Sequence, residues 1–250
     1  MGGILDLIFP PRCAGCDRPG TLLCDACRGT LPLIDPGSAC ARCGAPMLGA
    51  SGPCAECRGR AFAFSVARCA ARLEPPVSRA VVMLKDSGER RYAAVLAELL
   101  ATAADGWLAP GAVLVPAPAS PAAVRRRGFD HAADITRALG RLTGAEVQCL
   151  LRATGSADQR ALGREARFAN RATAFRLAGP REIAAGASLP ERVVLVDDVF
   201  TTGATLDAAA RVLRGAGVAE VRALAVARAC EHVACVSVSE RIQSEGASLD

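Results

Sequence analysis

Residues 193–206 of the chain read VVLVDDVFTTGATL, and this stretch decides the fold. The apolar run over 192–196 is typical of a buried central strand of a parallel sheet. Two carboxylates, Asp197 and Asp198, stand at the predicted carboxyl end of that strand, and a helix is predicted over 204–214. Ligands of open α/β sheets bind at the carboxyl ends of the strands, so the stretch predicts a binding site.

The loop after the carboxylates suits a phosphate monoester, because it offers hydroxyls and the backbone N–H groups of a helix start. Gly203 lets the backbone approach closely, while Asp197 and Asp198 would repel a bare phosphate and should meet hydroxyls instead. A ribose 5-phosphate has both chemistries. The predicted phosphate-binding residues are Thr201, Thr202, Gly203, Ala204 and Thr205.

Simpler interpretations of the same stretch explain less. An Asp-capped helix after a strand accounts for one aspartate and one threonine, but not for the whole run. The chain has no G-x-x-x-x-G-K-[ST] sequence, and Gly215 and Gly217 follow a helix rather than a strand. A P-loop and a dinucleotide fingerprint are therefore not supported.

On both sides of this stretch, apolar patterns predict strands alternating with helices. This order indicates an α/β domain with a mostly parallel sheet flanked by helices. We expect the domain to span 61–230, after a cysteine-rich module at 1–60 and before a flexible tail at 231–250. The predicted strands are 62–73, 113–115, 146–151, 192–196 and 221–226, and the predicted helices are 76–85, 92–104, 129–142 and 204–214.

The apolar residues of the module at 1–60 follow neither a helical nor a strand period. The module therefore cannot build a core of its own and needs disulfides or a metal ion to stabilise it. Its cysteines form four C-x-x-C pairs, and two such pairs complete a tetrahedral zinc site. Four pairs offer ligands for two structural zinc ions. The predicted ligands are Cys13, Cys16, Cys24, Cys27, Cys40, Cys43, Cys54 and Cys57.

Alternatives for the cysteines remain open at this point. Redox motifs usually come singly, at the start of a helix in a βαβ unit, so a redox role fits four pairs less well than zinc. The pairs could share metal between sequence neighbours or in a crossed arrangement, and one site could be complete while the other is degraded.

Composition and charge narrow the class of protein. Hydrophobic residues make up 51% of the 250-residue chain and charged residues 22%, as in a globular protein. No apolar run reaches the roughly 18 residues of a membrane span, and we interpret residues 1–9 as a short helix packed on the fold. Clustered thiols suit the reducing cytoplasm. Residues 121–181 hold twelve arginines against five acidic residues, which favours an anionic ligand.

The stretch 193–206 resembles the phosphoribosyl-pyrophosphate signature of type I phosphoribosyltransferases. Together with the cysteine pairs, nearly the whole chain up to about residue 228 resembles the ComF family of competence and GntX-type proteins, which carries an amino-terminal double zinc ribbon. Further matching positions are Leu5 to Cys13, Leu84-Lys85, Val115-Pro116, Arg127-Gly128-Phe129, Arg152, Thr154, Gln159, Leu162, Arg167 and Asn170.

The resemblance implies a phosphoribosyltransferase that binds phosphoribosyl pyrophosphate with Mg²⁺ and takes part in DNA uptake during natural transformation. It implies catalytic roles for Asp197 and Asp198, and contacts of Lys85 and of Arg125, Arg126 and Arg127 with pyrophosphate. Lys85 is the only lysine of the chain, and the three arginines could equally lie in a solvated loop. Single-stranded DNA and a DNA-processing protein are the implied partners.

Two positions depart from the family pattern. Asp130-His131 replaces the usual Asn-Gln after Arg-Gly-Phe, and the segment after Pro116 lacks its usual polar residue. His131 could act as a general acid or base, but we expect it on a helix surface.

Three functions remain open. The first is a Mg²⁺-dependent phosphoribosyltransferase with an undefined acceptor. The second is a non-catalytic factor that binds single-stranded DNA, and the third is an adaptor whose zinc module docks a partner protein. The intact carboxylate pair and phosphate loop favour a ligand-binding protein over a pure adaptor.

Overall fold

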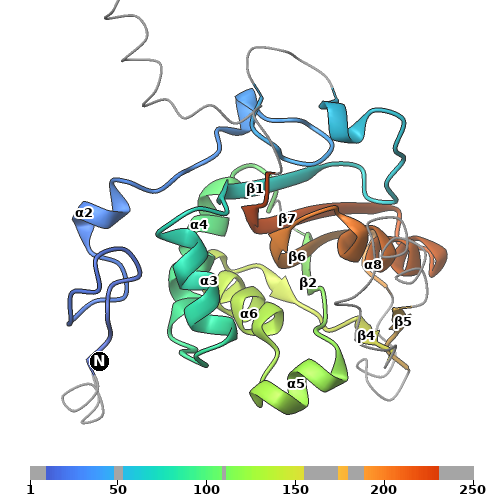
Figure 1. Ribbon diagram of the computed structural model, residues 1–250. Helices are drawn as coiled ribbons and strands as arrows, with labels where there is room; N and C mark the ends of the chain where they lie inside the picture. The colour runs from blue at the N-terminus through green and yellow to red at the C-terminus, as the bar shows by residue number, and fades with distance from the viewer. Residues whose placement is uncertain (1–9, 48–52, 109–110, 155–173, 180–188, 231–250) are drawn as a thin grey trace, which may run out of the picture.

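The computed structural model describes residues 10–47, 53–108, 111–154, 174–179 and 189–230. Its centre is a five-stranded sheet with the order β1-β7-β6-β2-β3 (Figure 1). All neighbouring strands of this sheet pair in parallel, which confirms the α/β prediction. The strands are β1 (Ala67–Arg72), β7 (Glu220–Arg228), β6 (Arg192–Phe200), β2 (Val113–Pro116) and β3 (Glu146–Val147).

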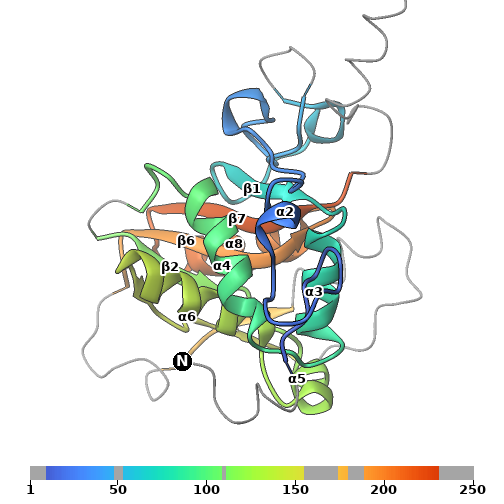
Figure 2. The ribbon, with the colours of Figure 1, turned by 90° about the vertical axis from the view of Figure 1, so that its left-hand side faces the viewer.

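Helices cover both faces of the sheet. On one face lie α3 (Val77–Lys85), α4 (Tyr92–Ala103) and α6 (His131–Thr143), which stand in front of the sheet in Figure 2. On the other face lies α8 (Ala204–Gly215), visible at the right-hand side of Figure 1. Within the described ranges, no helix combines the length and the apolar character that a membrane crossing would need.

The alternation of β6 explains how one strand serves both faces. Val194 and Val196 join the core beneath α3, α4 and α6, whereas Val193 and Leu195 join the core beneath α8. Successive side chains of a strand point to opposite faces. The same alternation directs Asp198 toward α3 and α6, and Asp197 toward the side of α8.

Several predicted boundaries were wrong. The strand predicted over 192–196 continues through both aspartates to Phe200, because β6 stays paired with β7 as far as Arg228. The strand predicted over 146–151 is two short strands: β3 belongs to the main sheet, and β4 (Leu151–Ala153) pairs with β5 (Phe175–Leu177) in a separate antiparallel ribbon.

The run of three arginines lies on a helix, not in a loop. This helix, α5 (Pro121–Arg127), begins with the Ser120 side chain accepting a hydrogen bond from Ala123 N–H and ends at Gly128 in the left-handed conformation. A serine cap followed by proline is a typical helix start. The Asp130 side chain then caps α6 by accepting from Ala133 N–H.

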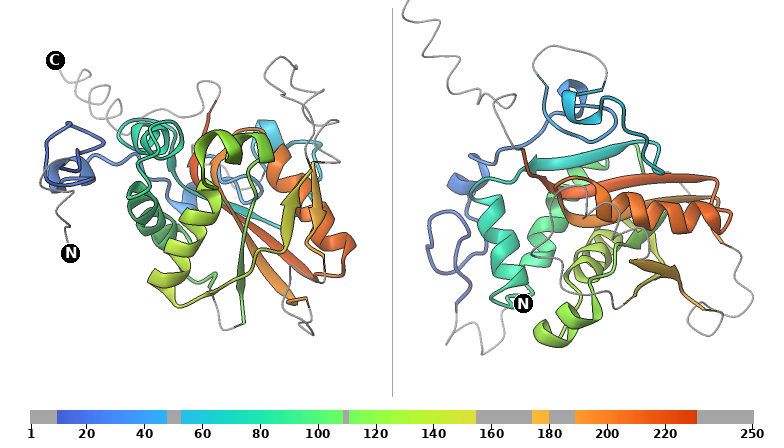
Figure 3. Two further views of the ribbon diagram at one scale, coloured as in Figure 1. Left: turned by 90° about the horizontal axis from the view of Figure 1, so that it is seen from below. Right: turned by 45° about the vertical axis from the view of Figure 1, so that its right-hand side comes forward.

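The cysteine-rich segment forms two small ribbons, one beside α3 and α4 and the other above β1 in the view of Figure 1; Figure 3 shows both from further sides. The first ribbon, residues 10–31, contains α2 (Asp25–Arg28) and packs against α3 and α4. The second ribbon, residues 36–60, contains η1 (Pro36–Ser38) and η2 (Ala55–Cys57) and shares the core beneath α8.

The chain between the ribbons runs along the outer edge of β1. Leu33 forms an isolated antiparallel bridge with Ala71, Ile34 N–H donates to Ala70 O, and Arg72 N–H donates to Pro32 O. The sheet edge at β1 is thereby paired. The predicted helix at 1–9, the tail at 231–250 and the matching positions Gln159, Leu162, Arg167 and Asn170 lie outside the described residues.

Candidate functional site

The eight predicted zinc ligands form two groups of four, each made of pairs that neighbour one another in sequence. Within each group the four sulfurs lie within 4.8 Å of one another. The crossed arrangement and the degraded second site are therefore not what the structure shows. The groups are Cys13, Cys16, Cys24 and Cys27 in the first ribbon, and Cys40, Cys43, Cys54 and Cys57 in the second.

The sulfur spacing fits zinc. A tetrahedron with Zn–S bonds of about 2.3 Å has edges of about 3.8 Å between sulfurs. The Sγ–Sγ distance is 3.7 Å for Cys13 and Cys24 and 3.5 Å for Cys43 and Cys54. None of the described cysteines forms a disulfide. With four thiolates per centre, no coordination position is left for a substrate, so both sites are of the structural type.

Backbone N–H groups stabilise the thiolate form of one cysteine in each ribbon by donating hydrogen bonds to its sulfur. Cys24 N–H donates to Cys13 Sγ, and Cys54 N–H donates to Cys40 Sγ. Burial opposes ionisation of both sulfurs, but these and neighbouring N–H groups lower the pKa of Cys13 to about 6 and that of Cys40 to about 7. Preformed thiolates favour metal binding at neutral pH.

A second group of polar residues lies at the carboxyl end of β6. Asp198 is 3% exposed and Asp197 is 8% exposed. The Asp198 N–H donates to Asp197 Oδ1 over 2.9 Å. Burial, and then the charge of Asp198, raises the pKa of Asp197 well above its usual range. The raised pKa favours the protonated form of Asp197, which can both donate and accept hydrogen bonds.

Lys85 balances the charge of Asp198. It is the last residue of α3, and its Nζ forms an ion pair with Asp198 Oδ2. Although burial opposes ionisation, the charge of Lys85 lowers the pKa of Asp198. The pKa values of the two carboxyl groups are thus shifted in opposite directions, and the ammonium lies beside Asp198, the one with the lowered pKa.

His131 was expected on a helix surface, and that expectation was wrong. It is the first residue of α6 and is buried, with Nε2 3.5 Å from Asp198 Oδ2. Burial lowers its pKa, so the ring is neutral. Arg127 Nη1 lies 3.5 Å from Nδ1, and because a guanidinium only donates, the ring proton sits on Nε2.

The three arginines of α5 divide into two groups. Arg125 and Arg126 are exposed, whereas Arg127 turns toward the site, with Nη2 3.8 Å from Asp86 Oδ1. Its buried Nε has no hydrogen-bond partner among the described residues. Arg127 is therefore the one of the three that the structure brings to Lys85 and His131.

The phosphate loop joins β6 to α8 through a sharp turn. Gly203 has a φ of 78°, and a Cβ there would stand 2.6 Å from Phe200 Cζ and 3.2 Å from Phe62 Cε1. Only glycine combines this backbone conformation with so close an approach. Thr201 is exposed and Thr202 and Thr205 are half-buried, so their hydroxyls remain accessible at the start of the helix.

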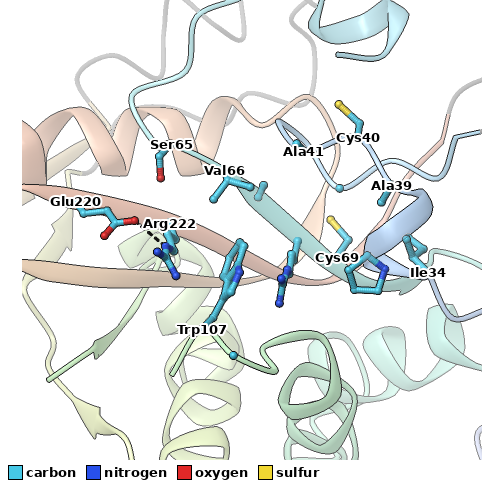
Figure 4. Close-up of a pocket in the computed structure, with 15 residues that line it drawn as sticks. Ile34, Ala39, Cys40, Ala41, Ser65, Val66, Cys69, Trp107, Glu220 and Arg222 are labelled. Atoms are coloured by element: carbon cyan, nitrogen blue, oxygen red, sulfur yellow. Dashed lines mark hydrogen bonds and ion pairs between the residues drawn. The ribbon is translucent and has the colours of Figure 1, made fainter. Parts of the chain in front are cut away.

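A cavity of about 630 Å³ lies elsewhere, at the amino ends of β1 and β7 (Figure 4). Trp107 stands beside Arg222, which pairs with Glu220, and the second ribbon forms one wall. This cavity is at the end of the sheet opposite to the carboxylates. It contains no phosphate loop, so we do not assign it to a sugar phosphate.

Sequence reasoning missed Arg228 and Glu56. Arg228 ends β7, is 1% exposed, and forms a 2.7 Å ion pair with Glu56 of the second ribbon. A signal was present, because an arginine directly follows an apolar strand that should be buried. Nothing in the spacing indicated its partner, 172 positions away.

Comparisons with known proteins agree with this architecture. Residues 4–58 match the double zinc ribbon domain, and residues 180–237 match the phosphoribosyl transferase domain. The chain is 29% identical over 235 residues to the DNA utilization protein YhgH of Salmonella typhimurium, covering 89% of this chain and 99% of the relative. The protein of the same name from Salmonella typhi is similar to the same extent. The chain thus joins a double zinc ribbon to a phosphoribosyltransferase domain, which agrees with its resemblance to the ComF family.

Proposed function

We propose that the site at the carboxyl end of β6 binds the ribose 5-phosphate part of phosphoribosyl pyrophosphate together with Mg²⁺. The observation that carries this proposal is the buried pair Asp197 and Asp198 followed at once by the Gly203 turn and the start of α8. Groups suited to hydroxyls and groups suited to a phosphate thus follow one another along the chain, as a ribose 5-phosphate requires.

Each group then has a defined task. The N–H groups and hydroxyls of Thr201 to Thr205 bind the 5-phosphate, and the carboxyl groups bind the two ring hydroxyls. Lys85 has three donors and uses one on Asp198, so two remain for pyrophosphate. Arg127 offers its unpaired Nε to the same group.

Mg²⁺ would screen the charge of the leaving pyrophosphate. The lysine beside Asp198 places a positive charge where a resident cation would otherwise sit, which favours a metal that arrives with its pyrophosphate. Transfer to an acceptor needs positioning and electrostatic stabilisation of a cation-like C1, and the buried, ionised Asp198 supplies negative charge near the ribose. We propose phosphoribosyl transfer as the chemistry, with Asp197 and Asp198 as the catalytic carboxyl groups.

We further propose a role in DNA uptake and use, in the cytoplasm. The curated relatives are named DNA utilization proteins, and thiol groups arranged for metal suit a reducing compartment. A second candidate function, binding of single-stranded DNA without catalysis, is favoured by the same relatives and by the basic segment 121–181.

Calorimetric titration of the zinc-loaded protein with phosphoribosyl pyrophosphate and Mg²⁺ tests the proposal. The Asp197→Asn, Asp198→Asn double variant should lose at least about 100-fold in affinity, because the hydrogen bonds of both carboxyl groups to the ribose hydroxyls are weakened. The control is Glu220→Gln, which alters the distant cavity and should bind as wild type does.

Absence of binding in the wild type would overturn the sugar-phosphate site. A labelled single-stranded oligonucleotide, titrated at two salt concentrations, then tests the second candidate. DNA binding that weakens with salt and is unaffected by phosphoribosyl pyrophosphate would favour the accessory role.

A further inference from the structure

Arg228 places a positive charge in the interior behind the phosphate loop. Its guanidinium carbon lies 5.0 Å from the centre of the Phe200 ring. One nitrogen, Nη1, donates to Phe200 O over 3.3 Å and to Thr201 O over 2.8 Å. The residue thus holds the two carbonyl groups at which β6 ends and the phosphate loop begins.

Holding these carbonyls also fixes the N–H groups that follow them. In a trans peptide the C=O of one residue and the N–H of the next lie in one plane and point in opposite directions. The Phe200 carbonyl sets the direction of Thr201 N–H, and the Thr201 carbonyl sets that of Thr202 N–H. Since both carbonyls point at Arg228, both N–H groups point away from it, toward the open side of the loop.

The other end of the guanidinium reaches the second ribbon. Nη2 donates to Glu56 Oε2 over 2.7 Å, and Glu56 lies in η2 between the ligands Cys54 and Cys57. A planar guanidinium can hold carbonyls on one side and a carboxylate on the other at once. Arg228 is therefore a rigid link between the second cysteine group and the loop.

Two more contacts join the same elements. The Phe62 ring packs edge-on to Phe200, with centroids 6.4 Å apart, and closes over Gly203. Ala63 N–H donates to Asp207 Oδ1 over 2.7 Å in the first turn of α8. The chain that leaves the second ribbon thus packs against the turn and the helix start that form the phosphate loop.

We propose that Arg228, oriented by Glu56, is a positioning residue that aims the N–H groups of Thr201 and Thr202 at the ligand. The second ribbon is then a structural part of the sugar-phosphate site, whereas the first ribbon is not. The ligand in this statement is the one of the proposed function, but the order of the loop is a property of the ligand-free protein.

Hydrogen exchange of the full-length, zinc-loaded protein without ligand tests the positioning directly. Glu56→Gln keeps size and removes the charge that orients Arg228; it should raise exchange at Ala229, whose N–H donates to Phe200 O over 3.0 Å, by about tenfold, the equivalent of one weakened charged hydrogen bond. Arg228→Lys, which keeps the charge but cannot hold both partners, should raise it further.

The matched control is Glu98→Gln. Glu98 pairs with Arg28 over 2.9 Å and so links the first ribbon to α4, as Glu56 links the second ribbon to β7. Its loss should leave exchange at Ala229 unchanged. Because a change at buried Arg228 can impair folding, Glu56→Gln, whose side chain is 30% exposed, carries the decision.

Titration with phosphoribosyl pyrophosphate and Mg²⁺ is the second measurement. Affinity should fall about tenfold in Glu56→Gln and stay unchanged in Glu98→Gln. Unchanged exchange at Ala229 in Glu56→Gln, or equal effects of the two variants, overturns the positioning role. If the wild type does not bind the compound, the proposed function fails, and the exchange comparison still decides the role of Arg228.

Discussion

The two ribbons carry the same cysteine motif but relate differently to the rest of the protein. The first packs on α3 and α4 through a small apolar cluster of its own, in which Cys13, Leu23 and Val95 are buried. Two hydrogen bonds add to it: the Tyr92 hydroxyl donates to Arg12 O, and Arg79 donates to Gly15 O. The second is continuous with the interior, and Cys40, Cys43 and Cys57 belong to the core beneath α8. Identical metal-ligand chemistry therefore serves as an attachment in one case and as part of the core in the other.

The difference arises from the chain segment that leaves each ribbon. The segment after the second ribbon supplies Phe62 and Phe64, which stack at 4.7 Å and pack edge-on against Phe200. The segment after the first ribbon pairs with the edge of β1 and adds the smaller side chain of Ile34 to the core beneath α8. Motif spacing thus indicates where metal binds, whereas the neighbouring apolar residues decide how strongly metal binding and domain folding depend on each other.

The third cysteines offer the sharpest test of this comparison, because Cys24 and Cys54 are matched in role. Both are half-buried, both precede a short helix, and both donate their N–H to the first cysteine of their group. Cys54→Ser should lower the free energy of unfolding by on the order of 4 kcal/mol, since the core loses a metal centre. Cys24→Ser should cost under about 2 kcal/mol, and denaturant titration measures both.

Metal analysis accompanies that measurement, and each variant should retain one zinc per chain. Equal losses of stability in the two variants would contradict the view that the second ribbon is part of the core while the first is only attached to it.

Two glycines provide a second, smaller contrast. A Cβ on Gly44 would stand 2.8 Å from the backbone N of Cys69 in β1, and the φ of 66° adds strain. We expect Gly44→Ala to destabilise the whole protein by roughly 2–3 kcal/mol, because a strand backbone cannot move aside.

A Cβ on Gly15 would overlap the Cys27 sulfur. Gly15→Ala should therefore weaken zinc binding in the first ribbon and leave the melting temperature of the sheet domain nearly unchanged. A chelator competition assay and a thermal melt separate the two effects; a large shift in melting for Gly15→Ala would contradict the comparison.

The smallest effect is expected at His131, which lies at the carboxylate pair rather than in either ribbon. Burial lowers its pKa, while Asp198, Lys85, Asp130 and Arg127 are the charged groups around it. The unfolded chain therefore takes up a proton near pH 6.5 that the folded protein resists, and stability falls as pH drops below that value. His131→Gln should remove this loss, so the stability of the wild type relative to the variant should decline from pH 7 to pH 5. A constant difference would argue against a buried, neutral imidazole.

Much of this architecture could be predicted from local signals. The apolar run before Asp197, the glycine turn and the four cysteine pairs each encode their structure within a few residues. The helix that caps with Ser120 and Pro121 was missed, because the three arginines that follow dominate the composition of the segment. The early end assigned to β6 has the same origin, since charged residues were taken to stop a strand that backbone pairing with β7 extends.

Contacts between distant segments could not be predicted in this way. Lys85 and His131 meet Asp198 because the end of α3 and the start of α6 lie at the same edge of the sheet, and only the strand order determines that. The partnership of Arg228 and Glu56 depends likewise on the second ribbon folding back over β7. A single sequence contains both residues but not their proximity.

The short pairing of Pro32 and Ile34 along β1 has a consequence for solubility. An open edge of a parallel sheet is a template on which a second molecule can add a strand, and proteins commonly cover such edges. In this protein the connection between the two metal-binding ribbons covers the edge. It precedes β1 in the sequence, so it is synthesised before β1. The edge is therefore shielded as soon as it forms, and a shorter chain that began at β1 would present it to its neighbours and self-associate.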